Sequence, residues 1–238
     1  MGPFQRILAF TTVLIWTRWL YEPSCECEFT FDDHLAVLNN EDVDTNKTSA
    51  APMWHHDIWG KDLVKIDSHK SWRPLLTFSF RLSHAAEGGF ATRPFHLPGI
   101  WLHALVSSML VVLADTLLQD LEVSFFVGML FASHPVHVEG VTSIVNRAEP
   151  MCAFFCLAAR FVYSRLASHF PAMSATERPL PILWAFWLQS ILKMICLGIL
   201  FVLLFTCAVL SKETGLTVVA VLGCYDILRE PPTSETGP

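Results

Sequence analysis

The sequence has few charged residues for its length, and this scarcity argues against one large soluble domain. Only 16% of its 238 residues are Asp, Glu, Lys or Arg, whereas about a quarter is usual in soluble domains. The formal net charge of −6 and the lack of a basic stripe give no general attraction for nucleic acid. With 53% hydrophobic residues and a mean hydropathy of +0.43, the composition is typical of an integral membrane protein.

Several signatures of soluble enzymes and metal sites are also missing. The chain has no P-loop, G-x-G-x-x-G or G-x-S-x-G, so nucleotide binding and serine hydrolysis lack support. Its seven cysteines show no paired C-x-x-C spacing, which disfavours a structural zinc site. Cys25 and Cys27 are candidates for oxidation outside the cytosol. The other five, from Cys152 to Cys224, lie in apolar runs and are expected to be buried thiols.

Apolar runs predict an all-α membrane protein with about six transmembrane helices. The first run, residues 7–16, is short and suits an uncleaved signal-anchor better than a cleaved signal peptide, because no small-residue cleavage site follows. Five further runs are expected to cross the membrane, at 97–118, 123–133, 151–166, 181–210 and 216–228. The third, fourth and sixth crossings are the weakest, since each run is short or contains a charge.

The same pattern divides the chain into four parts. Residues 1–21 form the signal-anchor or first span, 22–96 a large first lumenal loop, 97–228 the helix bundle and 229–238 a cytosolic tail. With a cytosolic N-terminus, parity places the 22–96 loop, "HPVHVEGVTSIVNRAE" and "SKETG" on the lumenal side. Asn46 begins the glycosylation sequon Asn-Lys-Thr, and we expect it to be glycosylated in that loop.

Two adjacent acids, Asp32 and Asp33, follow the first span in "FDDH". One carboxylate there could cap a helix, because Asp accepts hydrogen bonds from free backbone N–H groups. Two together repel each other, which raises the pKa of one and suits a general base. Both are therefore candidate catalytic residues, with Asp33 narrowly favoured over Asp32 as the base.

The motif "HPVHVE" contains His134, His137 and Glu139 and superficially resembles a set of metal ligands. A helical zinc site prefers His at i and i+4, and Pro135 interrupts the turn, so metal binding is disfavoured. The alternatives are donors that hold a phosphate or sugar, or histidines with satisfied structural roles.

The stretch "WHHDIWGKDLVKIDSHKSWRPL" gathers aromatic, His and basic side chains. Trp54, Ile58 and Trp59 fall near helical spacing, which predicts an amphipathic segment on the membrane. Arg73 offers a planar fork suited to a phosphate. An equally good alternative is that Arg73 pairs with a nearby acid.

Further charges stand where apolar runs begin or end. They are Arg147, Glu149, Lys212 and Glu213. Charged groups beside hydrocarbon are costly and suggest function, although helix ends also carry ordinary solvated charges.

Six strings then occur in an order that resembles one family. They are "FDDHLAVLNNEDV", "HDIWG", "SHKSWRPLLTFSFRL", "FHLPGIWLHALV", "LFASHPVHVEGVTSIVNRAE" and "LSKETGLTVV". Together they resemble the transmembrane and tetratricopeptide-repeat O-mannosyltransferases, the TMTC family, over about residues 29–228. Asn146 stands where the family usually has Gly before Arg-Ala-Glu.

The resemblance implies the N-terminal part of a GT-C glycosyltransferase fold in the membrane of the endoplasmic reticulum. Such enzymes transfer mannose from dolichyl-phosphate mannose, with no metal or other cofactor, to Ser or Thr of proteins such as cadherins. By position, Asp32 and Asp33 correspond to the acidic catalytic motif. The residues implied to bind the donor and its phosphate are His69, Arg73, His134, His137, Glu139, Arg147 and Lys212.

The family continues into tetratricopeptide repeats, but this chain contains no repeat of about 34 residues. The resemblance therefore predicts a fragment of such an enzyme. The alternative is a catalytically inactive, truncated membrane scaffold or adaptor.

Overall fold

The structure is a computed structural model that describes residues 2–172 and 180–228. Within these ranges the regular secondary structure is helical, and the bridge between His56 and Asp62 is the one pairing of extended backbone. The expected cytosolic tail, 229–238, lies outside the described residues.

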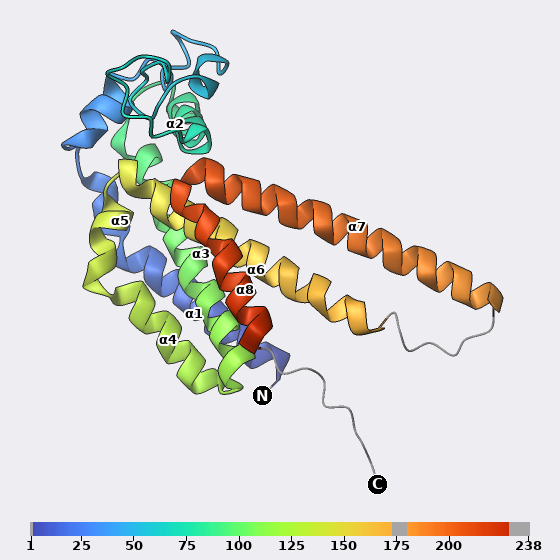
Figure 1. Ribbon diagram of the computed structural model, residues 1–238. Coiled ribbons are helices and arrows are strands. Elements are labelled where there is room, and N and C mark those ends of the chain that lie inside the picture. The colour runs from blue at the N-terminus through green and yellow to red at the C-terminus, as the bar shows by residue number, and fades with distance from the viewer. Residues whose placement is uncertain (1, 173–179, 229–238) are drawn as a thin grey trace.

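Six α-helices of the described chain build the bundle. They are α1 (Pro3–Leu20), α3 (Thr92–Leu118), α4 (Leu121–Ser133), α6 (Ala148–Ala172), α7 (Leu180–Ser211) and α8 (Thr217–Leu228). Their direction alternates, so the first-loop segment (residues 22–96), the α4–α6 connection and the α7–α8 turn share one end (Figure 1). At the opposite end Arg6 Nε lies 2.8 Å from Asp115 Oδ2 and ties the start of α1 to the end of α3.

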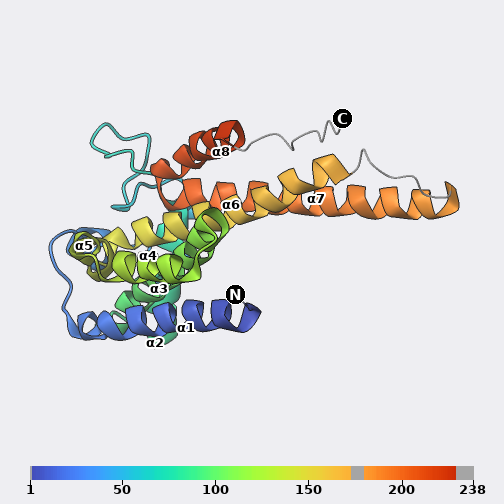
Figure 2. The same cartoon turned by 90° about the horizontal axis from the view of Figure 1, so that it is seen from below.

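The helices are layered in an order that follows the chain. Figure 2 shows α1 on one side, then α3 and α4, then α6 and α7, with α8 outermost. α3 and α4 approach closely at Gly128, where a Cβ atom would lie 2.3 Å from Cγ2 of Val111. Small residues at such contacts allow helices to pack closely in lipid.

Three helical segments of the described chain are long and apolar enough to cross a membrane: Thr92–Leu118, Val145–Ser168 and Trp187–Ser211. A fourth crossing is possible if Leu121–Ser133 and Pro135–Thr142, which meet at a bend of 46°, form one broken span. The prediction of an all-α membrane protein is therefore confirmed, whereas six crossings are not. The run expected at 216–228 forms a helix of only 12 residues.

The first-loop segment is folded around short helices rather than extended. Its elements are η1 (Glu22–Glu26), η2 (His34–Leu38), η3 (Pro52–Trp54) and α2 (Pro74–Glu87). Its buried core includes Val37, Val43, Ile58 and Phe80, and continues into Val145 of the bundle. Burial of apolar surface thus fixes this segment against the bundle end.

Asp57 organises the middle of the first-loop segment. Its buried carboxylate accepts hydrogen bonds from Ser68 Oγ at 2.6 Å and from the backbone N–H groups of Trp59, Lys61 and His69 at 3.0 Å each. Burial alone raises the pKa of Asp57, but these hydrogen bonds outweigh it, so the pKa lies below its ordinary value. One carboxylate therefore joins "HDIWG" to "SHKS".

The prediction of an amphipathic segment at Trp54, Ile58 and Trp59 is wrong. η3 ends at Trp54, and Ile58 belongs to the buried core, whereas Trp54 is 46% exposed. Trp72 Nε1 donates instead to the Trp54 carbonyl oxygen at 3.1 Å. Turns around Asp57 replace the helix that the spacing suggested.

The cysteine prediction also needs correction. Cys25 and Cys152 are buried, whereas Cys196 and Cys224 in the apolar runs are exposed, and all seven thiols are free. A residue in an apolar helix that faces lipid satisfies the hydropathy pattern without being covered by protein.

Candidate active site

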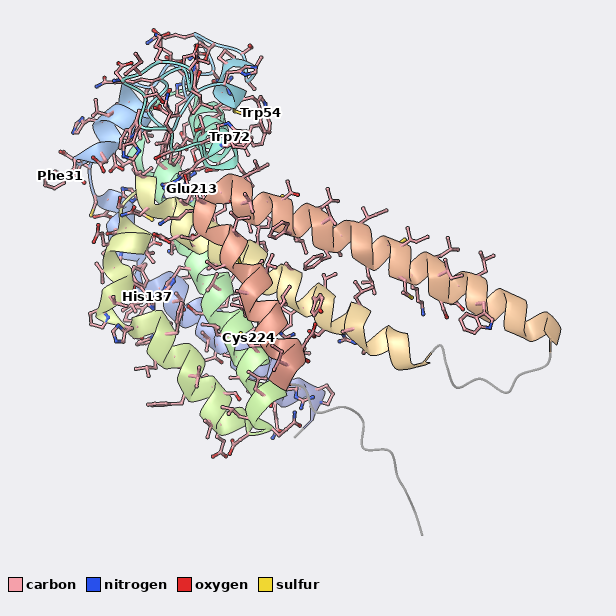
Figure 3. The ribbon with its side chains drawn as sticks, in the orientation of Figure 1. Phe31, Trp54, Trp72, His137, Glu213 and Cys224 are labelled. Atoms are coloured by element: carbon pink, nitrogen blue, oxygen red, sulfur yellow. The ribbon has the colours of Figure 1, made fainter. Side chains whose placement is uncertain are left out.

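The motifs expected on one side of the membrane meet at one end of the bundle. Figure 3 shows Phe31 at the outer edge of this end and Glu213 beneath the first-loop segment. His137 lies at the junction of α4 with α5 (Val138–Thr142). Contacts between Asp33 and Val145, Arg73 and Glu213, and Lys212 and Glu149 join segments that are far apart in the sequence.

The backbone from Phe31 onward directs the side chains of Asp32 and Asp33 to different surroundings. Phe31 has φ = 44°, a left-handed conformation that is unusual for a bulky residue, and its side chain is 92% exposed. A helical turn follows and leads into the π-helical η2. Consecutive side chains of a helical turn point about 100° apart. As a result Asp32 is exposed and Asp33 is buried.

Asp33 anchors this turn to the bundle. Its Oδ2 accepts a hydrogen bond from the Thr30 N–H, and its Oδ1 accepts one from the Val145 N–H, each at 3.1 Å. Its charge also stabilises the buried guanidinium of Arg147. Both carboxylate oxygens are thus engaged with the protein, at 2% exposure.

Asp32 faces a cavity of about 460 Å³, which we call the acidic cavity. Its lining residues are Cys27, Glu28, Thr30, Phe31, Asp32, His96, Glu139, Thr142, Ser143, Val145 and Asn146. Asn146 Nδ2 donates to Glu139 Oε1 at 3.5 Å. Asn146 has no positive φ, so the change from Gly leaves the backbone in an ordinary conformation. The cavity is wide enough for a side chain to reach Asp32.

A second cavity lies on the other face of α5 (Val138–Thr142). Gly140 and Val141 line this smaller cavity of about 210 Å³, together with His137 and Glu149. The Lys212 ammonium pairs with the carboxylate of Glu149 at its edge.

An apolar groove of about 840 Å³ continues from this second cavity. It runs between α3, α6 and α8 and shares Val106, Phe131 and Ala153 with the smaller cavity. Arg160 lies in the groove, with its guanidinium 3.8 Å from the ring centroid of Tyr225. The groove is therefore lined mainly by apolar side chains, with Arg160 as its charged residue among those described. At the smaller cavity, Glu149 joins the lining to Lys212 through their ion pair.

Arg73 pairs with a nearby acid, which is one of the two roles that the sequence predicted for it. Its Nε and Nη2 donate to Glu213 Oε2 at 3.2 and 3.0 Å, which joins the first-loop segment to the α7–α8 turn. Desolvation raises the pKa of Glu213, but bonds from its own backbone and from Arg73 outweigh it, so the pKa lies below its ordinary value.

Arg147 does not reach either cavity. It is 1% exposed and donates to the Ser79 and Phe95 carbonyl oxygens, with its guanidinium carbon 4.8 Å from the Phe80 ring centroid. A phosphate could not contact it without displacing the core, so the structure replaces the expected donor-binding role with a structural one.

The remaining predicted residues lie apart from the acidic cavity. His69 is exposed and its Nδ1 lies 2.5 Å from Ser71 Oγ, while His134 Nδ1 accepts from the Val136 N–H at 3.2 Å. Asn46 is exposed on the first-loop segment. No group of three His, Cys, Asp or Glu side chains in the described chain is placed to hold a metal ion.

Sequence reasoning missed His96 and Glu28, both of which line the acidic cavity. His96 Nε2 lies 3.1 Å from the Cys27 carbonyl oxygen. His96 stands in "FHLPGIWLHALV", one of the strings that carry the family resemblance, and this could have drawn attention to it. Nothing in the sequence around Glu28 distinguishes it from a surface acid.

Comparison with known proteins gives three informative relatives. The chain is 32% identical over 243 residues to protein O-mannosyl-transferase TMTC4 of Mus musculus, covering 96% of this chain and 30% of that protein. It is 36% identical over 208 residues to TMTC2 of Homo sapiens, covering 87% and 22%. It is 33% identical over 210 residues to Tmtc2 of Drosophila melanogaster, covering 88% and 20%.

No family model and no solved structure matches the chain. The chain spans between a fifth and a third of the length of these curated relatives. Similarity to relatives that all carry one family name nevertheless extends over almost the whole chain. Over the region that it spans, this chain belongs to the TMTC family of protein O-mannosyl-transferases.

Proposed function

We propose that this chain carries the catalytic face of a protein O-mannosyltransferase of the endoplasmic reticulum membrane. The observation that supports it most is the exposed carboxylate of Asp32, in a cavity at the end of the bundle where the motifs meet. The named activity of the relatives supports the same chemistry. The N-terminal part of a GT-C fold, with the 22–96 loop in the lumen, is the architecture that we propose for it.

The donor is dolichyl-phosphate mannose, and the apolar groove is suited to its polyprenyl chain. Burial of a hydrocarbon chain against the groove lining is favourable. His137 and the Lys212–Glu149 ion pair lie at the smaller cavity, where the groove ends. The phosphate of such a lipid would lie there. Lys212 is held by Glu149 and would exchange this partner for the phosphate.

Asp32 is the general base, in place of Asp33. The acceptor hydroxyl oxygen of Ser or Thr forms a bond to the anomeric carbon, and the bond from that carbon to the phosphate oxygen breaks. The electron pair leaves with dolichyl phosphate, the hydroxyl proton passes to Asp32, and the configuration inverts. Asp33, with both oxygens engaged, holds the turn that presents Asp32.

The donor and acceptor sites lie on opposite faces of α5. Glu139 and Thr142 line the acidic cavity, whereas Gly140 and Val141 line the donor side. The mannose therefore reaches Asp32 across α5, and Glu139 is placed to contact it. Arg73 and Arg147 hold the site together without contacting substrate. The acceptors are secretory-pathway proteins, of which cadherins are one class.

The test uses a chimera in which this chain replaces the matched region of human TMTC2. We expect Asp32→Asn to lower mannose transfer by roughly 10²–10⁴-fold, because a positioned base typically contributes that much. Abundance and membrane insertion should stay normal, and Glu87→Asn, at an exposed position on α2, is the control.

Three results would contradict the proposal. Normal transfer by the Asp32→Asn chimera would remove Asp32 as the base. An equal loss in the Glu87→Asn control would show that the effect is not local. A correctly inserted chimera with no transfer at all would favour the scaffold function.

A further inference from the structure

Arg160 carries a charge inside a membrane-spanning segment. It lies on α6 within Val145–Ser168 and is 8% exposed. None of the ion pairs among the described residues includes it. An ionisable group within a membrane span is costly, and it normally faces a partner, a cavity or a lipid headgroup. Arg160 therefore needs a negative partner that the described residues do not supply.

The contacts that Arg160 makes leave most of its donors free. Its Nη1 donates to Ser164 Oγ, and its guanidinium carbon lies 3.8 Å from the Tyr225 ring centroid. Ser164 is the one hydrogen-bond acceptor that the described residues offer it, whereas a guanidinium has five N–H donors. The next residue in α8, Asp226, accepts a hydrogen bond from the Tyr163 hydroxyl and forms no ion pair with the guanidinium. Several donors thus remain for a ligand.

Arg160 lines the apolar groove at the end farther from the motifs. Leu117, near the end of α3, and Cys224, near the end of α8, line the groove with it. Figure 3 shows Cys224 on the half of α8 that lies away from Glu213. The charge of Arg160 therefore lies well apart from the smaller cavity at the other end of the groove.

The side chain of Arg160 is directed toward the nearer membrane surface. Arg160 lies about 12 Å of helix rise from Ser168, where the span ends. Its hydrogen bond to Ser164 directs the guanidinium one turn closer to that end. Long basic side chains reach from hydrocarbon to the headgroup level in this way. The guanidinium is therefore within reach of the phosphates of the leaflet at this end.

The proposed donor does not supply the missing charge. Its phosphate would lie at the smaller cavity, and its polyprenyl chain is hydrocarbon. A diacyl phospholipid supplies both a charge and an apolar chain. Its phosphate oxygens match the planar fork of Arg160, and burial of an acyl chain against Leu113 and Leu117 is favourable. Charge and hydrophobicity thus indicate the same class of ligand.

We infer that the groove binds a phospholipid from the leaflet on the side of Arg6 and Asp115, with its phosphate at Arg160 and an acyl chain along the apolar lining. The Tyr225 ring holds the guanidinium plane in place. This site differs from the donor site, because the two lipids enter the groove from opposite ends. The inference does not depend on the proposed function, since lipid binding is measured without mannose donor or acceptor.

The test measures how a lipid protects Cys224 from N-ethylmaleimide in the 238-residue chain, purified in detergent and delipidated. Cys224 is exposed and lines the groove, whereas Cys196 is exposed on α7 outside it and serves as the internal control. Mass spectrometry of peptides follows each thiol separately. Dioleoyl-phosphatidylglycerol should protect Cys224 at a concentration roughly 10-fold lower than dioleoylglycerol does, because hydrogen bonds to a charged group add to burial.

Arg160→Met keeps an unbranched side chain and removes its charge. Phosphatidylglycerol should then protect Cys224 no better than dioleoylglycerol does, and Arg160→Lys should restore part of the difference, as a point charge without the fork. Arg165→Met is the matched control, because it removes the same charge from an exposed position on α6 outside the groove. It should keep the 10-fold difference, and the unfolding temperature of each variant checks its fold.

Equal protection by the two lipids in the parent chain would overturn the inference, and this comparison needs no variant. An equal loss in Arg160→Met and Arg165→Met would also overturn it, because general attraction for anionic lipid would then explain the binding. Inorganic phosphate that protects Cys224 as well as the phospholipid would replace the lipid with a free anion. Protection of Cys224 in the delipidated chimera with human TMTC2, without added lipid, would overturn the inference in favour of later segments of the protein.

Discussion

At the scale of single residues, two neighbouring carboxylates have different surroundings. Asp33 accepts hydrogen bonds from Thr30 and Val145, and the second of these partners lies 112 residues away. Asp32 instead lines the acidic cavity. A buried carboxylate with both oxygens engaged is costly to replace, whereas an exposed one is free to contact a substrate.

We expect Asp33→Asn to destabilise the fold by about 1–3 kcal/mol, because the new amide places N–H donors against a backbone N–H. Thermal unfolding in detergent should show the loss. Asp32→Asn, made in parallel, should leave stability nearly unchanged. If the two variants unfold at the same temperature as the parent chain, the anchoring role assigned to Asp33 is incorrect.

At the scale of elements, the α7–α8 turn depends on one glycine. A Cβ atom on Gly215 would lie 2.6 Å from the backbone carbon of Ala208 and 2.7 Å from its oxygen. These are backbone atoms, which cannot move aside as a flexible side chain can. The same turn carries Lys212 and Glu213, so its shape places both ion pairs.

Gly215→Ala should therefore destabilise the chain by about 1–3 kcal/mol through overpacking. Gly223→Ala is the control, since nothing lies within 4 Å of a Cβ atom at that position in α8. It should be neutral or slightly stabilising, because Ala favours helix over Gly. Comparison of the two unfolding temperatures checks the prediction, and equal losses would count against the tight turn.

The first-loop segment should lose stability in acid because of Asp57. Burial raises its pKa, but hydrogen bonds from Ser68 and three backbone N–H groups outweigh burial, so the pKa is lowered in the folded chain. The stabilisation is therefore present above the unfolded pKa of about 4 and is lost as the pH falls through the folded value. Below about pH 4, unfolding temperature should fall more steeply for the parent chain than for Asp57→Asn. Parallel curves for the two proteins would show that Asp57 does not contribute.

At the scale of the whole molecule, alternation of the helices gathers three distant motifs at one end. The sequon at Asn46 lies on the same end, in the first-loop segment, and its side chain is exposed. The opposite end carries the N-terminus and the Arg6–Asp115 ion pair. The orientation of the bundle therefore places all of these motifs and Asn46 on the same side of the membrane.

If the first-loop segment is lumenal, Asn46 should be glycosylated in cells. Glycosidase treatment should then increase the mobility of the chain on a gel, and Asn46→Gln should abolish the shift. An inserted chain without any shift would argue against the proposed orientation.

The membrane class, the family and one possible ion pair followed from the sequence. Long apolar runs predict membrane helices, because backbone polar groups in lipid must be satisfied within the helix. The motif strings predicted the family, and Arg73 was already a candidate for pairing with an acid. These features are local, or are carried by residue type alone, so no knowledge of distant contacts was needed.

Only the tertiary structure decided which charged residues face a cavity. Asp33 and Arg147 are as polar in the sequence as Asp32 and Glu139, which line the acidic cavity. Contacts with Val145, Ser79 and Phe95 nevertheless bury Asp33 and Arg147. The crossings differ from expectation because α1 and α8 are not among the described helices that are long and apolar enough to span, and α4 reaches that length only together with the segment that follows its bend. Burial and direction depend on partners far away in the chain, and hydropathy cannot distinguish a face that meets lipid from one that meets protein.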